Sequence, residues 1–298
     1  MKHQLSLFPE LQLDNNQILF IIGNGFDLAH GIKSGYWHFK KWLIHNGKDS
    51  LVGLMDIFFS NERDVWSSIE QALGEYDEES ILEYCKPDKE FDFDHSLSAS
   101  ARIEDSPMAI FQPVLDEFRD AFRDWVNSIN ISGIEKIYKL YMSSRYLSFN
   151  YTDTLETVYG IPKNQIIHIH GSRLNNDEYI IGHNNYRDSS TVWERDGLIF
   201  EQRAYENIIY WMNEFIKNYD DIIASHSSFF DSLYDIKQIV VIGHSMSIID
   251  WPYFEEIIKN IGKAKILCVK ISSTLIVIFC ALVCFFDIMS FTLFSIKA

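Results

Sequence analysis

Residues 18–31 read ILFIIGNGFDLAHG, an apolar run followed by a glycine turn and the start of a helical pattern. Short apolar runs that are rich in β-branched residues and end at glycine are typical of strands buried in a parallel sheet. Gly23 permits a tight turn after the strand, and Gly25 permits close approach of the backbone. The stretch therefore predicts a strand, a turn and a helix whose first N–H groups can face an anion.

The glycine turn does not match the common nucleotide motifs. It lacks the GxxxxGK[ST] sequence of phosphate-loop NTPases, and Leu28 stands where the dinucleotide motif GxGxxG has its third glycine. Asp27 falls in the first helical turn, where an acidic residue favours the helix dipole. The turn is therefore either part of a nucleotide site or only a strand that leads into a capped helix.

Three later segments share the apolar pattern and predict the rest of the sheet. They are RYLSFN at residues 145–150, QIIHIHG at 165–171 and KQIVVIGH at 237–244. Helical patterns separate these runs, as the long connections between parallel strands require. The sequence therefore predicts an α/β fold with a parallel sheet.

Long helical patterns fill the gap between the first and second predicted strands. They include GYWHFKKWLIHN at 35–46 and SPMAIFQPVLDEFRDAFRDWVNSI at 106–129. The second has an apolar stripe that we expect in the core, formed by Phe111, Leu115, Phe118, Phe122, Trp125 and Val126. We predict a mostly helical insertion at about residues 46–140 and a second insertion at 186–234. Within the first, residues 75–107 are acidic without a clear period and predict a surface excursion.

The charge and cysteine content exclude some classes of partner. The chain of 298 residues has 26 Lys and Arg against 42 Asp and Glu, a formal charge of -16. Such a chain repels a phosphate backbone, so we expect no direct nucleic-acid binding, although local dipoles can still hold a single nucleotide. The cysteines lack metal-type spacing, so we expect neither a metal site nor a disulfide framework; they are Cys85, Cys268, Cys280 and Cys284.

Residues 265–298 form a tail that is almost wholly apolar, with Asp287 as the only charge between Lys270 and Lys297. The tail has three interpretations: a marginal membrane helix, a buried strand and helix that complete the domain, or an aberrant end of the reading frame. The first residues have no signal-peptide pattern, so we expect a cytoplasmic protein. In the first interpretation, residues 271–296 contact the membrane and anchor the protein to its inner face.

Polar side chains follow the predicted strands at their carboxyl ends, the edge at which open α/β sheets bind ligands. In SFNYTDTLE, residues 148–156, these side chains are Asn150 and Asp153. The alternative is that Thr152 or Asp153 caps a helix and Glu156 completes a capping box.

Histidines mark the next predicted strand end. In IIHIHGS, His168 and His170 alternate along the strand, so we expect both on one face. They are metal ligands, a general base or hydrogen-bonded core residues. Base chemistry ranks above metal binding because no nearby Cys or carboxylate completes a ligand set. His183, in IIGHNN, follows a further glycine.

The last predicted strand repeats the arrangement of the first. In VVIGHSMSIIDWPYF the strand ends at Gly243, and His244, Ser245 and Asp250 follow it. Ser247 occupies the final position of a GxSxG nucleophile elbow, which argues against a serine hydrolase.

These segments together resemble the bacteriophage abortive-infection AbiH family. The similarity runs through IIGNGFDLAHG, SFNYTDTLE, IHIHG, IIGHNN and VIGHSMSIIDWPYF and covers roughly residues 17–264. More distantly, the series is similar to Sir2-like NAD-consuming domains, whose motifs correspond to Asn150–Tyr151, His170–Gly171 and Gly243–Ser245. The resemblance implies an AbiH-like domain at 1–264, built on a Rossmann-like (Sir2-like) parallel sheet with helical insertions, and a separate tail at 265–298.

The Sir2-like resemblance also implies roles for single residues. The diphosphate of NAD or a related nucleotide would lie on Gly23, Asn24, Gly25, Phe26 and Asp27, and the adenosine end on Gly243, His244 and Ser245. Asp250 would also bind the nucleotide. Asn150 would orient the nicotinamide ribose or a water, and His170 would be the general base. Asp27 would meet positive charge on the sugar, and Asp153, displaced by one position from the acidic residue of the relatives, joins this catalytic set.

The expected function is anti-phage abortive infection through hydrolysis of the N-glycosidic bond of NAD or a related nucleotide. The alternatives are a non-catalytic module that senses a nucleotide and an effector that acts on the membrane through its tail. The expected partner is a small-molecule nucleotide, without a metal, and we also consider a homo-oligomer.

Overall fold

The computed structural model describes residues 14–59, 64–86, 97–175, 177–194, 198–261, 265–272, 275–282 and 292–295. By its internal contacts the chain forms two compact units. Unit 1 comprises residues 1–35, 126–180 and 218–298, and unit 2 comprises residues 36–125 and 181–217. The domain boundaries expected from the sequence stay a prediction.

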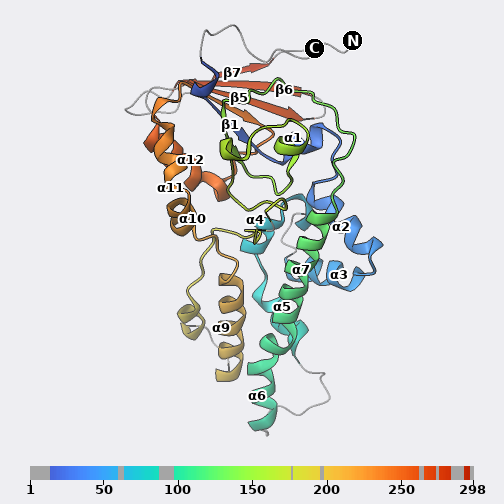
Figure 1. Ribbon diagram of the computed structural model, residues 1–298. Coiled ribbons are helices and arrows are strands. Elements are labelled where there is room, and N and C mark those ends of the chain that lie inside the picture. Colours follow the sequence, from blue (N-terminus) through green and yellow to red (C-terminus); the bar gives the residue numbers. More distant parts are fainter. Residues whose placement is uncertain are drawn as a thin grey trace. The chain divides into compact units, whose positions relative to one another are not determined.

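A mostly parallel sheet forms the centre of unit 1 (Figure 1). Its strands are β1 (Ile18–Ile22), β2 (Arg145–Ser148), β3 (Ile166–His168), β4 (Gln238–Ile242), β5 (Lys265–Ser272), β6 (Leu275–Leu282) and β7 (Thr292–Ser295). They lie in the order β3-β2-β1-β4-β5-β6-β7, parallel from β3 to β5, with β6 and β7 antiparallel. The predicted α/β fold, a Rossmann-like parallel sheet with helical insertions, is confirmed.

The sheet has a switch point beside its first strand. The chain passes from β1 to β2 and β3 on one side and returns to β4 on the other side, so that Ile21 pairs with both Leu147 and Val241. Ligands of open α/β sheets bind outside the carboxyl ends of the strands at such a point. The loops after β1 and β4 therefore lie where a fold of this kind binds its ligands.

Both faces of the central strands are buried. All five residues of β1 are buried, because alternate side chains enter two separate cores. Leu19 and Ile21 pack with helices α10 (Tyr219–Ser225), α11 (Ser227–Asp231) and α12 (Trp251–Asn260). Phe20 and Ile22 pack with α1 (Asn24–Ala29) and α8 (Thr154–Thr157). This two-sided burial explains why residues 18–22 are a continuous apolar run.

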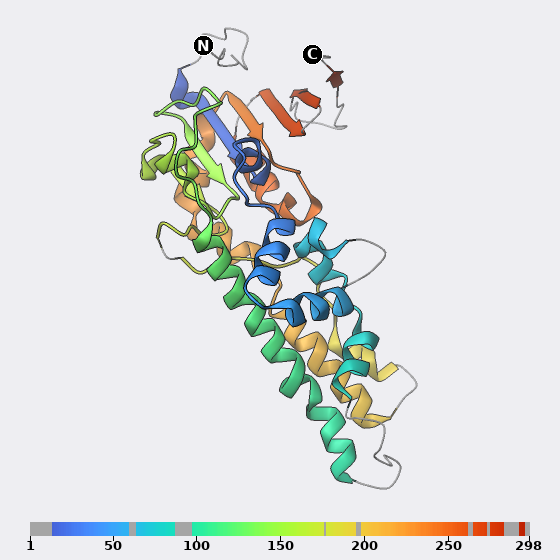
Figure 2. The ribbon, with the colours of Figure 1, turned by 90° about the vertical axis from the view of Figure 1, so that its right-hand side faces the viewer.

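Unit 2 is helical. Its helices are α2 (Tyr36–His45), α3 (Asp49–Phe58), α4 (Ile69–Gly74), α5 (Glu78–Cys85), α6 (Leu97–Ser106), α7 (Gln112–Ser128, in this unit through Trp125) and α9 (Ile199–Asn213). A π-helical segment, Pro107–Phe111, joins α6 to α7, and Figure 2 shows these segments as one long rod. Helices α6 and α9 pack against each other.

The apolar stripe of α7 lies in the core as predicted. Phe118 and Phe122 are almost fully buried, and both rings contact Phe39 of α2, at centroid distances of 5.9 and 5.5 Å. The predicted surface excursion at 75–107 is wrong in part. It contains α5, whose Ile81 and Leu82 are buried, and α6, while residues 87–96 lie outside the described part.

The described parts of the tail are the strands β5, β6 and β7 and not a helix. The interpretation as a membrane helix therefore finds no support in them, and residues 273–274, 283–291 and 296–298 lie outside the described part. Among the described residues, none of the helices has the length and apolar character needed to cross a membrane.

Candidate functional site

The carboxyl ends of the parallel strands bring together most of the predicted site residues. Gly23 follows β1, Asn150 lies beyond β2, and Gly243 follows β4. Strand β3 ends at His168, so the prediction that both histidines lie on the strand is wrong for His170. The two rings meet different partners, because the backbone leaves the strand geometry before Gly171, whose φ is 88°.

Three glycines hold the β1 and β4 loops in direct contact. The Gly25 N–H donates to the Gly243 carbonyl (2.8 Å), and the Gly23 N–H donates to the Ile242 carbonyl (3.0 Å). A Cβ on Gly25 would lie 2.8 Å from Gly243 Cα, and a Cβ on Gly243 would lie 2.1 Å from Phe26 N. The φ of Gly243, 69°, also favours glycine. Glycine is therefore needed here for the approach of two loops.

Asp27 is fully buried in the first turn of α1. Its Oδ2 accepts a hydrogen bond from Thr152 Oγ1 (2.5 Å). Its Oδ1 has no hydrogen-bond partner among the described residues. Burial raises the pKa of Asp27 to about 6, although the side chains of Thr152, Thr154 and Asn150 favour the charged form. Asp27 is thus a buried carboxyl group whose pKa lies well above its ordinary value.

Asn150 is one of the residues whose side chains favour the charged form of the Asp27 carboxyl group. It is 6% exposed, and its Oδ1 has no hydrogen-bond partner among the described residues. Its backbone carbonyl accepts a hydrogen bond from His168 Nδ1 (2.9 Å), while His168 Nε2 lies 3.0 Å from Glu156 Oε1. Both partners of the imidazole are acceptors, so the pair holds two protons, one for each hydrogen bond.

His168 and Glu156 form a buried ion pair that fixes the Asn150 backbone. Burial lowers the pKa of His168, but the hydrogen bond and negative charge of Glu156 outweigh it and raise that pKa above its ordinary value. Glu156 Oε2 has no hydrogen-bond partner among the described residues. Of the three roles that the sequence leaves open for His168, the structure shows the hydrogen bonds of a buried side chain. The sequence predicts Glu156 only as part of a capping box and gives no signal of its pairing with His168.

Asp153 occupies the N-cap position of α8 without a side-chain capping bond. Its Oδ1 accepts a hydrogen bond from Arg173 Nε (2.6 Å) and its Oδ2 from Thr157 Oγ1 (2.5 Å). Burial raises the pKa of Asp153, but the bonds from Thr157 and Arg173 outweigh it and hold that pKa below its usual range. The alternative of a capping box is wrong, because Glu156 turns to His168 instead.

Asp250 lies between two histidines. Its Oδ1 is 3.7 Å from His170 Nε2, and its Oδ2 is 3.4 Å from His244 Nε2. The Met246 N–H donates to His244 Nδ1 (2.9 Å), which places the ring proton of neutral His244 on Nε2, toward Asp250. All three charged or ionisable side chains are at least nine-tenths buried. Phe149 packs against both imidazoles, with ring centroids 5.3 and 4.2 Å away.

The remaining predicted residues have other surroundings. Phe26 is in the core, stacked on Tyr138 at 5.4 Å. Asn24 is exposed and accepts a hydrogen bond from Ser34 Oγ (2.5 Å), and Ser245 is exposed. His183 belongs to unit 2, where its Nε2 lies 3.0 Å from the Met212 carbonyl. The described residues contain no group of three or more His, Cys, Asp or Glu arranged to hold a metal.

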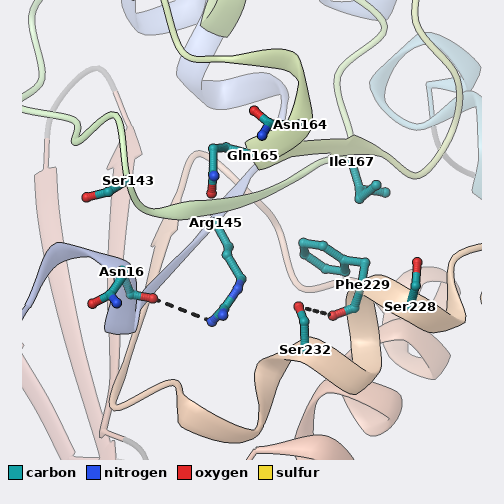
Figure 3. Close-up of a pocket in the computed structure, with 9 residues that line it drawn as sticks. All are labelled: Asn16, Ser143, Arg145, Asn164, Gln165, Ile167, Ser228, Phe229 and Ser232. Atoms are coloured by element: carbon teal, nitrogen blue, oxygen red, sulfur yellow. Dashed lines mark hydrogen bonds between the residues drawn. The ribbon is translucent and has the colours of Figure 1, made fainter.

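A cavity of about 380 Å³ lies at the opposite edge of the sheet, beside the amino ends of the strands. Figure 3 shows its lining: Asn16, Ser143, Arg145, Asn164, Gln165, Ile167, Ser228, Phe229 and Ser232. Arg145 Nη1 is 2.6 Å from Asp235 Oδ1. None of the predicted site residues lines this cavity, and ligands of parallel sheets bind at the other edge.

The comparisons with known proteins give one match. A family model described as "Bacteriophage abortive infection AbiH" matches residues 19–271, which include all the site residues above and nearly all of β5. No curated protein and no solved structure gives a significant match to the chain.

Proposed function

The chain belongs to the bacteriophage abortive infection AbiH family, and from this premise we propose that it binds a nucleotide at the carboxyl edge of its sheet and hydrolyses the N-glycosidic bond. The family indicates a role in abortive infection of phage. The proposed substrate is NAD or a related nucleotide, whose loss would stop the host cell and therefore the phage.

The pairing of His170 with Asp250 is the observation that carries the proposal. A carboxylate 3.7 Å from the imidazole favours the imidazolium that forms when the ring takes a proton. A buried histidine of this kind is a general base for an attacking water. His244 gives Asp250 a second partner, which supports the orientation of the carboxylate.

Asp27 and Asn150 supply the second half of the chemistry. Cleavage of an N-glycosidic bond develops oxocarbenium charge on the sugar. Two buried oxygens that lack donors, Asp27 Oδ1 and Asn150 Oδ1, can stabilise that charge in a site of low dielectric. The water adds to C1′ and gives its proton to His170, while the electrons of the broken bond remain on the departing nicotinamide, which leaves neutral.

The test is nicotinamide release from NAD by purified protein. We expect His170→Ala to lower the rate about 10²- to 10⁴-fold, the usual contribution of a general base. The matched control is His45→Ala, which removes an exposed histidine of α2 and should leave the rate unchanged. Release that is unaffected by His170→Ala would refute the assigned base, and nucleotide binding without release would favour the sensing module.

A further inference from the structure

Three of the N–H groups at the β1 turn are engaged within the fold. The amides of Gly23, Gly25 and Phe26 donate to the carbonyls of Ile242, Gly243 and Gly23, at 3.0, 2.8 and 2.9 Å. The glycines serve the contact between the two loops, where added Cβ atoms would collide. These three amides therefore give a phosphate no free donors.

The side chains beside this turn present acceptors. Asp27 Oδ1 and Asn150 Oδ1 are both buried and both lack a donor among the described residues. Thr152 supplies its hydroxyl proton to the other Asp27 oxygen. Buried acceptors in folded proteins nearly always accept a hydrogen bond. Two buried acceptors without donors at the carboxyl edge of the sheet therefore indicate a ligand that brings hydrogen-bond donors. Phosphate oxygens are acceptors and carry the same sign of charge as the Asp27 carboxylate.

We propose that Asp27 and Asn150 bind the vicinal hydroxyls of a ribose, and that the phosphates of the substrate lie away from the β1 turn. This inference rests on the proposed function, since it names the part of the nucleotide that this site holds. A ribose offers two adjacent O–H donors, one for Asp27 Oδ1 and one for Asn150 Oδ1, and the Asn150 side chain lies close enough to Asp27 to favour its charged form. It also places the anomeric carbon beside the carboxylate, as the proposed cleavage requires.

The test measures binding by calorimetry with a ribonucleoside that cannot be cleaved. The probe is 3-(β-D-ribofuranosyl)benzamide, whose base is joined to the sugar by a carbon–carbon bond, together with its 2′-deoxy form and its 5′-monophosphate. We expect the wild-type chain to bind the ribose form at least about tenfold more tightly than the 2′-deoxy form. The loss of one hydrogen bond to a charged group weakens the affinity by about this factor.

The variants Asp27→Asn and Asn150→Ala assign this preference to the site. Each should weaken binding of the ribose form about tenfold and remove its advantage over the 2′-deoxy form. Asn164→Ala is the matched control in the cavity at the other edge of the sheet. It should change neither the affinity for the ribose form nor its advantage over the 2′-deoxy form. Circular dichroism of each variant checks that it is folded.

Several outcomes would overturn the inference: no binding of the ribose form, equal binding of the 2′-deoxy form, or loss of binding in Asn164→Ala. A phosphate at the turn would instead make Asp27→Asn bind the monophosphate more tightly relative to the nucleoside. The two proposals fail separately. Ribose selectivity without nicotinamide release overturns hydrolysis alone, and release from NAD without ribose selectivity overturns this inference alone.

Discussion

Asp27→Asn should stabilise the fold above pH 6 and leave it nearly unchanged at acidic pH. The pKa of Asp27 is about 6 in the folded chain, against an ordinary value of 3.8. One pKa unit corresponds to about 1.36 kcal/mol, so the ionised carboxylate costs the folded state about 3 kcal/mol. Asparagine keeps the shape and an acceptor oxygen for Thr152 but cannot ionise.

The sign follows from proton binding. Between the two pKa values the folded chain holds a proton at Asp27 that the unfolded chain has lost. The free energy of unfolding therefore falls as the pH rises through this window and stays lower above it. Asp27→Asn should remove that fall, so it gains up to about 3 kcal/mol over the wild type near pH 8 and almost nothing near pH 4.

The measurement is urea unfolding of both proteins across this range, with separate analysis of any transitions that belong to the two compact units. Asp153→Asn is the matched control, because Arg173 and Thr157 hold the pKa of that carboxyl below its usual range. Its ionised form stabilises the fold above the ordinary pKa, so this variant should lose stability near pH 8. Equal destabilisation by Asp27→Asn at both pH values would refute the reasoning.

Two further changes test the framework of the site. Gly243→Ala should lower the free energy of unfolding by more than about 3 kcal/mol, because the added Cβ would lie 2.1 Å from the Phe26 backbone nitrogen. Gly133 also has a positive φ but has open space around it, so Gly133→Ala should cost only about 1–2 kcal/mol in the same urea assay. Similar costs for the two variants would contradict the collision. The wild-type free energy of unfolding should decline as the pH rises from the ordinary histidine pKa through the raised pKa of His168, and Glu156→Gln should make this decline smaller. NMR titration of the imidazole should show a lower pKa of His168 in this variant. An unchanged titration would contradict the ion pair.

The sheet could be predicted from sequence because its signals are local. The strands β1, β2 and β4 coincide with apolar runs that end at a turn, and two-sided burial leaves a continuous run of apolar residues. The sequence predicts that the third strand continues to His170, two residues past the end of β3 at His168. The alternating histidines continue the period of a strand after its hydrogen bonds have ended. The period alone does not report where pairing stops.

The partners of the site residues could not be predicted in the same way. The contact of Asp27 with Thr152 joins residues 125 positions apart, and the loops after β1 and β2 meet only because β1 and β2 are neighbours. The pairing of Glu156 with His168 depends on side-chain rotamers, which the residue types do not determine. The sequence therefore predicts that the site lies at the carboxyl edge of the sheet, but it does not predict which acidic side chain pairs with which histidine.

Asp27 and Asp153 differ in their hydrogen-bond donors and in the direction of their pKa shifts, and this difference favours a ligand at the carboxyl edge of the sheet. Asp153 has Arg173 and Thr157 as donors, so the fold itself explains its charge. Asp27 accepts a hydrogen bond from Thr152, and Thr154 and Asn150 also favour its charged form, but burial outweighs all three and raises its pKa. Its charge at neutral pH therefore works against the fold, and its Oδ1 has no hydrogen-bond partner among the described residues. A neutral side chain of the same shape would pack equally well and would give a higher free energy of unfolding at neutral pH. Strained groups of this kind persist where function requires them, which makes Asp27 the residue whose replacement should most clearly separate stability from activity.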